Sequence, residues 1–488
     1  MVGNPEINEV TNEVKLIFSV QPGNRTYTRK ILFTGNDITQ DYVLRREMRQ
    51  FEGAWTSDNS IEAGKVRLER LGYFKEVNVE TIPVPGTEDQ IDIVYSVEEE
   101  TTGSVGGNIG YSDFGLMLGF NLQEQNFLGS GNTVGIGINK NIYSEMYNIS
   151  YMNPYATRDA VSLGYNVFFR ETDYGEFNVA NYLTNSNGFG AQFGYPISDI
   201  SRLGFNITYD KTDIDIGTLP AREIYDFVSV EGNIFETLTA QLSWQQVTLN
   251  RGLFPTDGAS TVVSFSSTIP GSDLSYYRFN IRQRYYQPLS SDFVFGFQGE
   301  IGYLDSYGDT EEIPFFQNFY AGGPRSLRGF ESNTLGPRST DAPCYEFNYE
   351  DGTCPNLLDT DGDGEADAPY LNPYANQGQR SRYRDAPIGG NIKVEGSLQL
   401  IFRLPFIEDQ RSLRSAFFFD FGNVFSDNCK EYQINCSELS VDELRYSYGV
   451  GVTWITGFGP MSLAIAKPTN AGPLERTEEF QFTVGNVF

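Results

Sequence analysis

Residues 293–303 read FVFGFQGEIGY, and this stretch decides the fold. Its alternate positions carry two kinds of side chain, apolar ones at Phe293, Phe295, Phe297, Ile301 and Tyr303 and small or polar ones at Gly296, Gln298, Glu300 and Gly302. Because successive side chains of a β-strand point to opposite faces, this strand has one apolar and one polar face. A carboxylate such as that of Glu300 is tolerated in a wet lumen and not against lipid. The stretch therefore predicts a strand of a membrane-spanning β-barrel.

The same alternation recurs along the chain from about residue 103. It is clear in residues 161–169, 398–404 and 417–421, and in the last of these Asp420 falls on the polar face. Counting such segments predicts a mainly β chain with an antiparallel transmembrane barrel of about sixteen strands over residues 103–488, and an even number lets the first and last strands pair. A soluble β-sandwich or propeller would also alternate, but it would rarely place Phe outward on strand after strand.

Composition and charge narrow the classes of function. The chain of 488 residues contains no His, which removes Ser-His-Asp nucleophile arrangements and the common His-containing zinc sites. We therefore expect no enzymatic activity and no required cofactor. The net charge of −29 would repel phosphates, so no nucleic-acid partner is expected. No apolar run approaches the length of a membrane-spanning helix.

The first hundred residues follow a different pattern, and residues 24–100 read as one small β-α-α-β-β domain. Its expected elements are a strand at 28–34, a helix over 39–51 with Val43, Leu44, Met48 and Phe51 at helical spacing, a helix from Ser57 to Gly72, and strands from Lys75 and Gln90. Residues 1–23 resemble the end of a preceding copy of this small domain. Met1 is followed by neither a basic start nor an apolar core, so we expect a piece of a longer exported protein.

The four cysteines form two close pairs in polar, loop-like stretches. We expect disulfides between Cys344 and Cys354 and between Cys429 and Cys436, with four free thiols as the alternative. Each bridge would stabilise its short loop by about 2 to 3 kcal/mol in the chain-entropy model. Strand counting places the longest insertion, about 307–388, at the sixth outer loop and the second pair at the seventh, which fits the oxidising exterior that disulfides require.

The sixth loop begins FYAGGPRSLRGFESNTLGPR at residue 319, and here the chain resembles the BamA family of outer-membrane protein assembly factors of Gram-negative bacteria. The family hallmark is the RGF tripeptide, here Arg328, Gly329 and Phe330. Further stretches carry the resemblance: RREMRQFEGAW (45–55), NPYATRD (153–159), LNRGLFPTDG (249–258), TIPGSD (268–273), FFFDFGNVF (417–425) and EFQFTVGNVF (479–488).

The resemblance implies that residues 24–100 are the last of several POTRA domains, in the periplasm, and residues 103–488 a barrel in the outer membrane and in contact with its lipid. It also implies that the RGF loop folds into the lumen with Arg328 against inward carboxylates. The chain departs from the family at Gln399, where an acidic residue is expected. We therefore predict Asp420, with Glu395 as a further candidate, as the partner of Arg328; a solvated loop arginine is the alternative.

The resemblance also suggests partners. Accessory assembly lipoproteins of the family are expected to dock on the POTRA domain, with Arg45, Arg46 and Glu47 as candidate contacts. An ordinary charged helix face explains these three residues equally well. The other expected partners are nascent outer-membrane β-barrel proteins.

An acidic stretch of the sixth loop matches part of a calcium-loop template. Asp359, Asp361, Asp363 and Asp367 occupy positions 1, 3, 5 and 9 of that template, but Tyr370 replaces the bidentate glutamate of position 12. A solvated acidic loop is therefore the favoured interpretation, and weak calcium binding the alternative.

The first and last barrel strands are predicted to meet at a weak seam. The first strand is rich in glycine at Gly103, Gly106, Gly107 and Gly110, and the last contains Gly485 and ends at Phe488. Glycines deprive a strand of packing and loosen its register. A seam that opens could template the strands of other barrels by edge pairing. A secretion pore for a dedicated substrate and a passive porin are the alternative functions.

Overall fold

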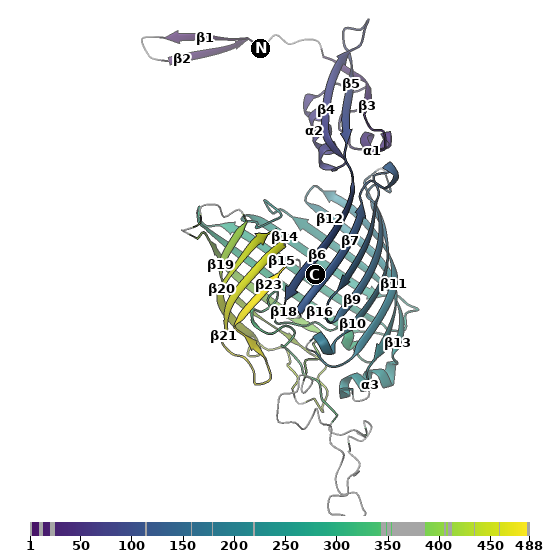
Figure 1. The fold of residues 1–488 in the computed structure, drawn as a ribbon, viewed down its shortest axis with the longest axis vertical. Helices are drawn as coiled ribbons and strands as arrows, with labels where there is room; N and C mark the ends of the chain where they lie inside the picture. The colour runs from purple at the N-terminus through teal and green to yellow at the C-terminus, as the bar shows by residue number, and fades with distance from the viewer. Residues whose placement is uncertain are drawn as a thin grey trace, which may run out of the picture. The chain divides into compact units, whose positions relative to one another are not determined.

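The computed structural model describes residues 2–8, 13–19, 25–112, 115–157, 159–177, 179–217, 220–342, 348, 353, 386–404, 407, 412–433, 435–457 and 459–485. The chain divides into two compact units, one of residues Met1–Gly103 and Glu124–Thr133 and one of residues Ser104–Gln123 and Val134–Phe488 (Figure 1). None of the described helices is both long enough and apolar enough to cross a membrane.

The first unit contains a hairpin and a small α+β domain. The hairpin pairs β1 (Val2–Asn8) with β2 (Glu13–Ser19), and the domain contains β3 (Tyr27–Thr34), α1 (Asp41–Arg45), α2 (Asp58–Arg70), β4 (Phe74–Pro83) and β5 (Gln90–Glu99). The sheet order is β3-β5-β4, with β3 parallel and β4 antiparallel to β5. This is the β-α-α-β-β order predicted from the sequence. Both helices bury apolar side chains against the sheet: Val43 and Leu44 of α1 and Ile61 and Leu68 of α2 form one cluster with Ile93 and Tyr95 of β5.

The first helix is much shorter than predicted. It ends at Arg45, and Phe51, assigned to its apolar face, is 69% exposed. The buried side chain of Gln50 replaces the helical bonds: its amide donates to the carbonyls of Phe51 and Trp55, and its oxygen accepts from the amide of Ser57. A side chain that bonds to the nearby backbone in this way competes with the helix. The second helix begins as predicted, with Ser57 accepting from Ser60 at its N-terminus.

A segment that the sequence assigned to the barrel belongs to the first unit. Residues Glu124–Thr133, which include the short helix η1 (Phe127–Gly129), pack on the small domain. The amide of Gln40 donates to the carbonyl of Gly129 at 2.9 Å, and Asn126 donates to the hydroxyl of Thr39 at 2.8 Å. A Cβ on Gly129 would lie 1.9 Å from the carbonyl oxygen of Ile38, so only glycine permits this approach. The contact joins residues about ninety positions apart, beyond the reach of local sequence patterns.

The second unit is a closed barrel whose strands, in spatial order, are β10-β11-β12-β13-β14-β15-β16-β18-β19-β20-β21-β23-β6-β7-β8-β9. These sixteen strands confirm the predicted fold. Their bounds are β6 Gly103–Ser112, β7 Gly115–Glu124, β8 Thr133–Lys140, β9 Ser144–Asn153, β10 Ser162–Asp173, β11 Leu183–Ser198, β12 Ser201–Asp215, β13 Ile234–Val247, β14 Gly258–Thr268, β15 Tyr276–Pro288, β16 Phe293–Ser306, β18 Ile392–Phe402, β19 Leu413–Phe425, β20 Arg445–Thr456, β21 Gly459–Pro468 and β23 Phe480–Val484. Five further elements of this unit are not strands of the barrel wall: η2 (Gly175–Phe177), α3 (Arg222–Glu231), η3 (Phe315–Gln317), β17 (Gly329–Phe330) and β22 (Thr477–Glu478).

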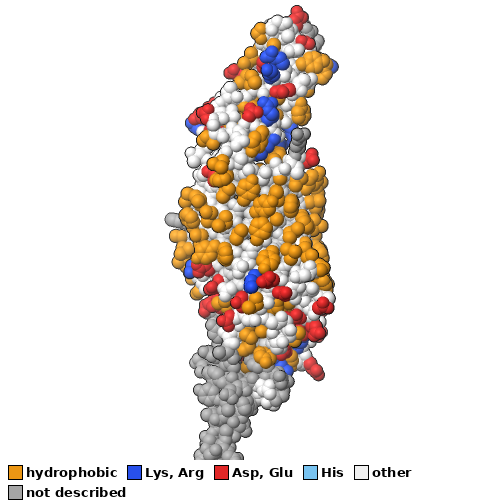
Figure 2. All heavy atoms as spheres, turned by 90° about the vertical axis from the view of Figure 1, so that its right-hand side faces the viewer, with side chains coloured by type: hydrophobic (Ala, Val, Ile, Leu, Met, Phe, Trp, Pro, Cys, Tyr) orange, Lys and Arg blue, Asp and Glu red, His pale blue; other side chains and the backbone are white. Residues whose placement is uncertain are grey.

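The outer face of the wall is apolar. Aromatic side chains at Phe169, Phe189, Phe205, Phe265 and Phe417 are each at least 40% exposed. Figure 2 shows hydrophobic side chains gathered in a broad band over the visible wall, with most charged groups above and below it. A water-soluble protein rarely exposes so large an apolar surface. The band therefore identifies a lipid-facing wall.

The lumen is partly filled by the sixth outer loop, the connection between β16 and β18. A buried cluster joins loop residues such as Leu327, Phe330 and Leu335 to α3 and to wall residues such as Leu304 and Val424. Phe330 and Leu335 are fully buried. Hydrophobic burial therefore holds the described part of this loop inside the barrel.

Candidate functional site

The RGF tripeptide lies at the inner face of the wall, where Arg328 meets Asp420 of β19. Arg328 Nε and Nη2 donate to the two carboxylate oxygens, each at 2.7 Å, and the backbone amide of Arg328 donates to the same carboxylate at 3.2 Å. The Asp420 side chain is 0% exposed and that of Arg328 is 16% exposed. A buried charge requires such pairing, and the planar guanidinium binds both oxygens at once.

Two neighbours complete the environment of this ion pair. Arg328 Nη2 also donates to Ser397 Oγ of β18 at 3.0 Å, and the guanidinium carbon lies 3.4 Å from the ring centroid of Phe418. The face of the Phe418 ring attracts the guanidinium cation. The Ser397 hydroxyl accepts a guanidinium N–H that does not bond to the Asp420 carboxylate. Sequence reasoning missed both residues; the parity that places Asp420 inward also places Phe418 inward, and this signal could have found it.

Glu395, the further candidate partner of Arg328, binds other residues. Its carboxylate is bound by Ser326 of the loop and by Lys393 at 3.2 Å. The register explains the difference, because β18 pairs Ser397 with Asp420 and pairs Glu395 with Gly422, two positions further along the strand. Gln399, which lies where the family pattern expects an acid, donates to Ser397 at 3.2 Å. Among the described residues, the carboxylate that binds the RGF arginine is therefore that of Asp420.

The glycine and phenylalanine of the tripeptide fix the loop against the last strands. Gly329 has a φ of 90°, and a Cβ there would lie 3.2 Å from Ala466 Cβ, so a larger residue would be both strained and crowded. Gly329 and Phe330 form β17, which pairs antiparallel with β22. The side-chain amide of Gln481 on β23 donates to the carbonyl of Phe330 at 2.8 Å and accepts from the amide of Gly329 at 3.3 Å. Sequence reasoning did not single out Gln481.

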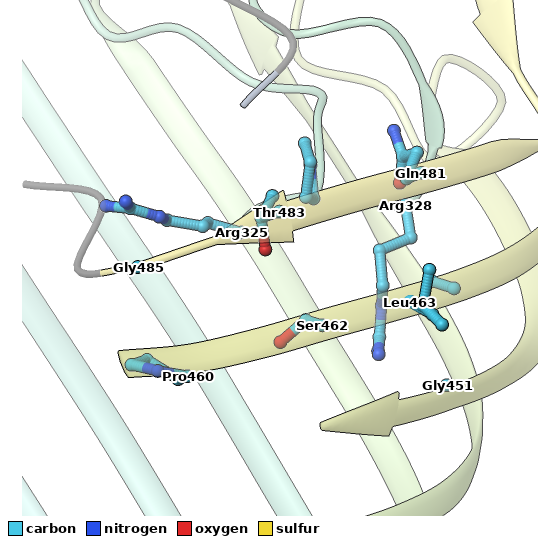
Figure 3. Close-up of a pocket in the computed structure, with 11 residues that line it drawn as sticks. Arg325, Arg328, Gly451, Pro460, Ser462, Leu463, Gln481, Thr483 and Gly485 are labelled. Atoms are coloured by element: carbon cyan, nitrogen blue, oxygen red, sulfur yellow. The ribbon is translucent and has the colours of Figure 1, made fainter. Parts of the chain in front are cut away.

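A cavity of about 260 Å³ lies between the loop and the inner face of β20, β21 and β23. Figure 3 shows its lining, with Gln481, Thr483 and Gly485 following one another along the last strand, Pro460, Ser462 and Leu463 on β21, and Arg325 and Arg328 from the loop. The loop therefore contacts the last strands without filling the whole space behind them.

The seam lies between β23 and β6. Among the described residues these strands share the partner pair Val484 with Tyr111, and residues 486–488, which follow β23, lie outside the described residues. Gly485 has a φ of 79°, and a Cβ there would lie 2.5 Å from the carbonyl oxygen of Ile109. The seam glycines Gly103, Gly106, Gly107 and Gly110 all lie in β6, and Phe488 lies outside the described residues.

The candidate docking residues in the POTRA-like domain are mostly engaged within the domain. Glu47 is 3% exposed and accepts two bonds from Arg67, which fixes it as a structural carboxylate and does not suit a surface contact. Arg46 is mostly buried and lies 3.7 Å from Glu47. Arg45 has a 44% exposed side chain and pairs with Asp41 at 3.0 Å and with Glu52 at 3.2 Å.

The described part of the outer loops contains one of the two predicted disulfides. Cys429 and Cys436 are bonded, with their Cα atoms 5.8 Å apart, in the connection between β19 and β20. Lys430 in this loop pairs with Glu312 of the sixth loop at 2.6 Å, so the bridged loop is tied to its neighbour. Cys344, Cys354 and the acidic stretch with Asp359, Asp361, Asp363 and Asp367 lie outside the described residues, and the second disulfide and the calcium site stay predictions. Within the described residues, no cluster of acidic or cysteine side chains is arranged to hold a metal ion.

Comparisons with known proteins agree with this geometry. Residues 126–488 match the family model of the Omp85 superfamily domain, and residues 26–100 match a POTRA model described as a surface antigen variable number repeat. The outer membrane protein assembly factor BamA of Neisseria meningitidis serogroup B is 30% identical over 99% of this chain and 59% of its own length. The chain thus spans about three fifths of that relative.

Two more relatives extend the comparison. The crystal structure of BamA from Haemophilus ducreyi lacking POTRA domains 1–3 superposes with a TM-score of 0.81 at 31% identity, covering 99% of this chain and 88% of that one. A mouse sorting and assembly machinery component 50 homolog is 24% identical over 86% of this chain and 81% of its own length.

Proposed function

This chain belongs to the Omp85 superfamily, and from that premise we propose that it folds and inserts β-barrel proteins into the bacterial outer membrane by pairing their strands with its own first strand. The barrel is an outer-membrane barrel, and the POTRA domain is its periplasmic part. The proposed clients are nascent outer-membrane barrels, in line with the names of the BamA relatives.

The glycine-rich seam carries the proposal. Among the described residues Val484 pairs with Tyr111 across it, and Gly103, Gly106, Gly107 and Gly110 give β6 few side chains that could pack there, so opening the seam would make the edge of β6 available. Each backbone group left unpaired in hydrocarbon costs several kcal/mol, and an incoming strand that takes over those bonds removes most of the penalty. Exchange of one strand for another is then close to neutral and needs no nucleotide. We accordingly propose a mechanism without an enzymatic step.

The packed lumen weighs against a passive porin. Loop side chains such as Phe330 and Leu335 are fully buried in the barrel, and the ion pair of Arg328 and Asp420 holds the loop to the wall. A diffusion pore requires a wide, polar channel. Single-channel recordings should therefore show no large, steady conductance.

Reconstitution tests the function directly. Lipid vesicles containing this chain should accelerate the folding of an unfolded eight-stranded outer-membrane barrel, relative to vesicles containing a heat-denatured sample of the same chain. Depletion in the native host separates assembly from dedicated secretion. Loss of many outer-membrane proteins supports the proposal, and loss of a single exported substrate would instead indicate a secretion pore.

The accessory lipoproteins remain part of the proposal. Arg45 is exposed and remains the candidate for such a contact, because Glu47 forms an ion pair with Arg67 inside the domain. An Arg45→Ala variant that binds a purified accessory lipoprotein as tightly as the parent would remove this residue from the interface.

A further inference from the structure

The first unit exposes a small apolar patch where the turn between β7 and β8 packs on the small domain. Its members are Leu128 and Phe127 of the turn, which are 77% and 41% exposed, and Ile38, between β3 and α1, which is 69% exposed. Gly129 lies so close to the carbonyl of Ile38 that no Cβ fits between them. The side-chain amide of Gln40 donates to the carbonyl of Leu128 at 3.4 Å. Clustered apolar side chains of this kind mark an interaction surface.

Leu128 adopts a backbone conformation that leucine disfavours. Its φ of 52° and ψ of 32° lie in the left-handed region, where a Cβ crowds the backbone and where glycine or asparagine is the usual residue. In water the apolar side chain gains little at this position, because it is 77% exposed. Burial of the side chain in an apolar phase outside the protein would offset both the strain and the exposure.

The turn is suited to an apolar environment because its backbone groups are bonded within the protein. The amides of Phe127, Gly129 and Ser130 donate to carbonyls of the same turn at 2.9 to 3.1 Å. The amide of Gly131 donates to the buried side chain of Asn126 at 2.7 Å. An unpaired backbone group is costly near hydrocarbon, so this internal bonding allows the tip of the turn to leave water.

The path of the chain brings this turn to the membrane surface. The POTRA domain is periplasmic, and β6, which follows it, crosses the membrane outward while β7 returns. The turn Glu124–Thr133 therefore lies at the periplasmic side. The strand β7 reaches it through Leu118, Phe120 and Leu122, which alternate on the lipid-facing side and are 43% to 49% exposed. The patch is thus continuous along the chain with a surface that lipid already covers.

We propose that Leu128, Phe127 and Ile38 form an apolar foot that inserts into the periplasmic leaflet of the outer membrane and ties the POTRA domain to the bilayer surface. Asp37, next to Ile38, is exposed. The foot therefore reaches only the boundary between headgroups and acyl chains, where an apolar side chain is buried while a neighbouring carboxylate stays in water. The inference requires that the wall spans the membrane, and it does not depend on the proposed assembly of other barrels.

Depth-dependent quenching tests the insertion with the full chain in lipid vesicles. A fluorescent probe attached to Leu128→Cys should be quenched at least about twofold more by a spin label near the lipid headgroup than by one at the end of the acyl chain. Ile82→Cys is the matched control, because Ile82 is 47% exposed on β4 of the same domain, and its probe should not be quenched. The parent chain carried through the same labelling gives the blank.

Two results of this measurement would contradict the foot. A probe at Leu128 that is quenched no more than the probe at Ile82 would overturn the insertion. Stronger quenching by the deep label than by the shallow one would overturn the interfacial depth.

Hydrogen exchange in lipid nanodiscs adds a test whose sign separates insertion from simple strain. Leu128→Asn suits the left-handed conformation and removes the apolar side chain. If the patch faced water, relief of the strain would slow exchange over residues 126–131 or leave it unchanged. If the foot is inserted, loss of its burial should speed exchange there by roughly threefold to tenfold.

Two further variants complete the exchange experiment. Leu128→Met keeps an apolar side chain and should exchange like the parent over residues 126–131, and Ile82→Asn should leave this segment unchanged. Slower or unchanged exchange in Leu128→Asn would overturn the proposal. Should that variant fail to fold, the quenching result decides alone.

Discussion

Removal of the Arg328 guanidinium should destabilise the barrel more than removal of any exposed lumen arginine. Arg328→Ala leaves the fully buried Asp420 carboxylate without its partner, and breaking a buried pair in this way costs about 3 to 5 kcal/mol. Arg282→Ala is the matched control, because Arg282 also pairs with a lumen carboxylate, Glu300, but its side chain is 66% exposed. An exposed pair of this kind contributes about 1 kcal/mol or less.

The assay is denaturant unfolding of the barrel in lipid, followed by the fluorescence of Trp244 and Trp454. A double-mutant cycle gives the interaction energy between Arg328 and Asp420. The double variant Arg328→Ala with Asp420→Ala contains no unpaired buried charge at this position, so it should be no less stable than Arg328→Ala alone. Arg328→Lys should be intermediate, since an ammonium cannot bind both oxygens of Asp420 in one plane. Equal losses for Arg328→Ala and Arg282→Ala, or a coupling energy near zero, would refute the reasoning.

Three further predictions address the two compact units. The pKa of Glu99 is lowered: burial opposes the shift, but bonds from the Thr39 hydroxyl and from the backbone amides of residues 38 and 39 outweigh it. The POTRA domain should therefore lose stability as the pH falls through this pKa. In thermal melts, Glu99→Gln should make the melting temperature of the domain less dependent on pH in this acidic range. Replacing Cys429 and Cys436 by Ser should destabilise the outer loop by about 2 to 3 kcal/mol and speed its cleavage by an added protease, with unchanged cleavage as the contrary result. Gly485→Ala places a Cβ against the carbonyl of Ile109 and forces an unfavourable φ, so amides of residues 104–111 should exchange faster; exchange at the parent rate would show that the seam does not depend on this glycine.

Alternation of apolar and polar side chains was enough to predict the barrel wall, because the strand period of two is a local property of the chain. It also placed Asp420 inward, where the structure has it bound to Arg328. The same local reasoning could not choose between Asp420 and Glu395. That choice depends on the register of β18 against β19, which brings Ser397 and not Glu395 opposite Asp420.

One remaining difference has a local cause: the predicted helix over 39–51 is cut short because the side chain of Gln50 binds the backbone of Trp55 and Ser57, which follow it closely. The other differences come from non-local contacts. The packing of Gly129 on Ile38 and the bonds from Gln481 to the RGF loop join segments separated by ninety or more residues. A buried glutamine in an alternating strand has no distinguishing local pattern, so its role emerges only when the loop is in place.

Locking the seam is the most direct test of the central claim that clients assemble through it. The partner residues Tyr111 and Val484, both changed to Cys, would crosslink β6 to β23, and Phe205 with Leu242, both changed to Cys, would crosslink the fully paired β12 and β13 as a control. In vesicles, the oxidised seam variant should fold an unfolded eight-stranded client at least tenfold more slowly than its reduced form, and the control pair should have no effect. Client folding at the parent rate with the seam crosslink verified would contradict the account.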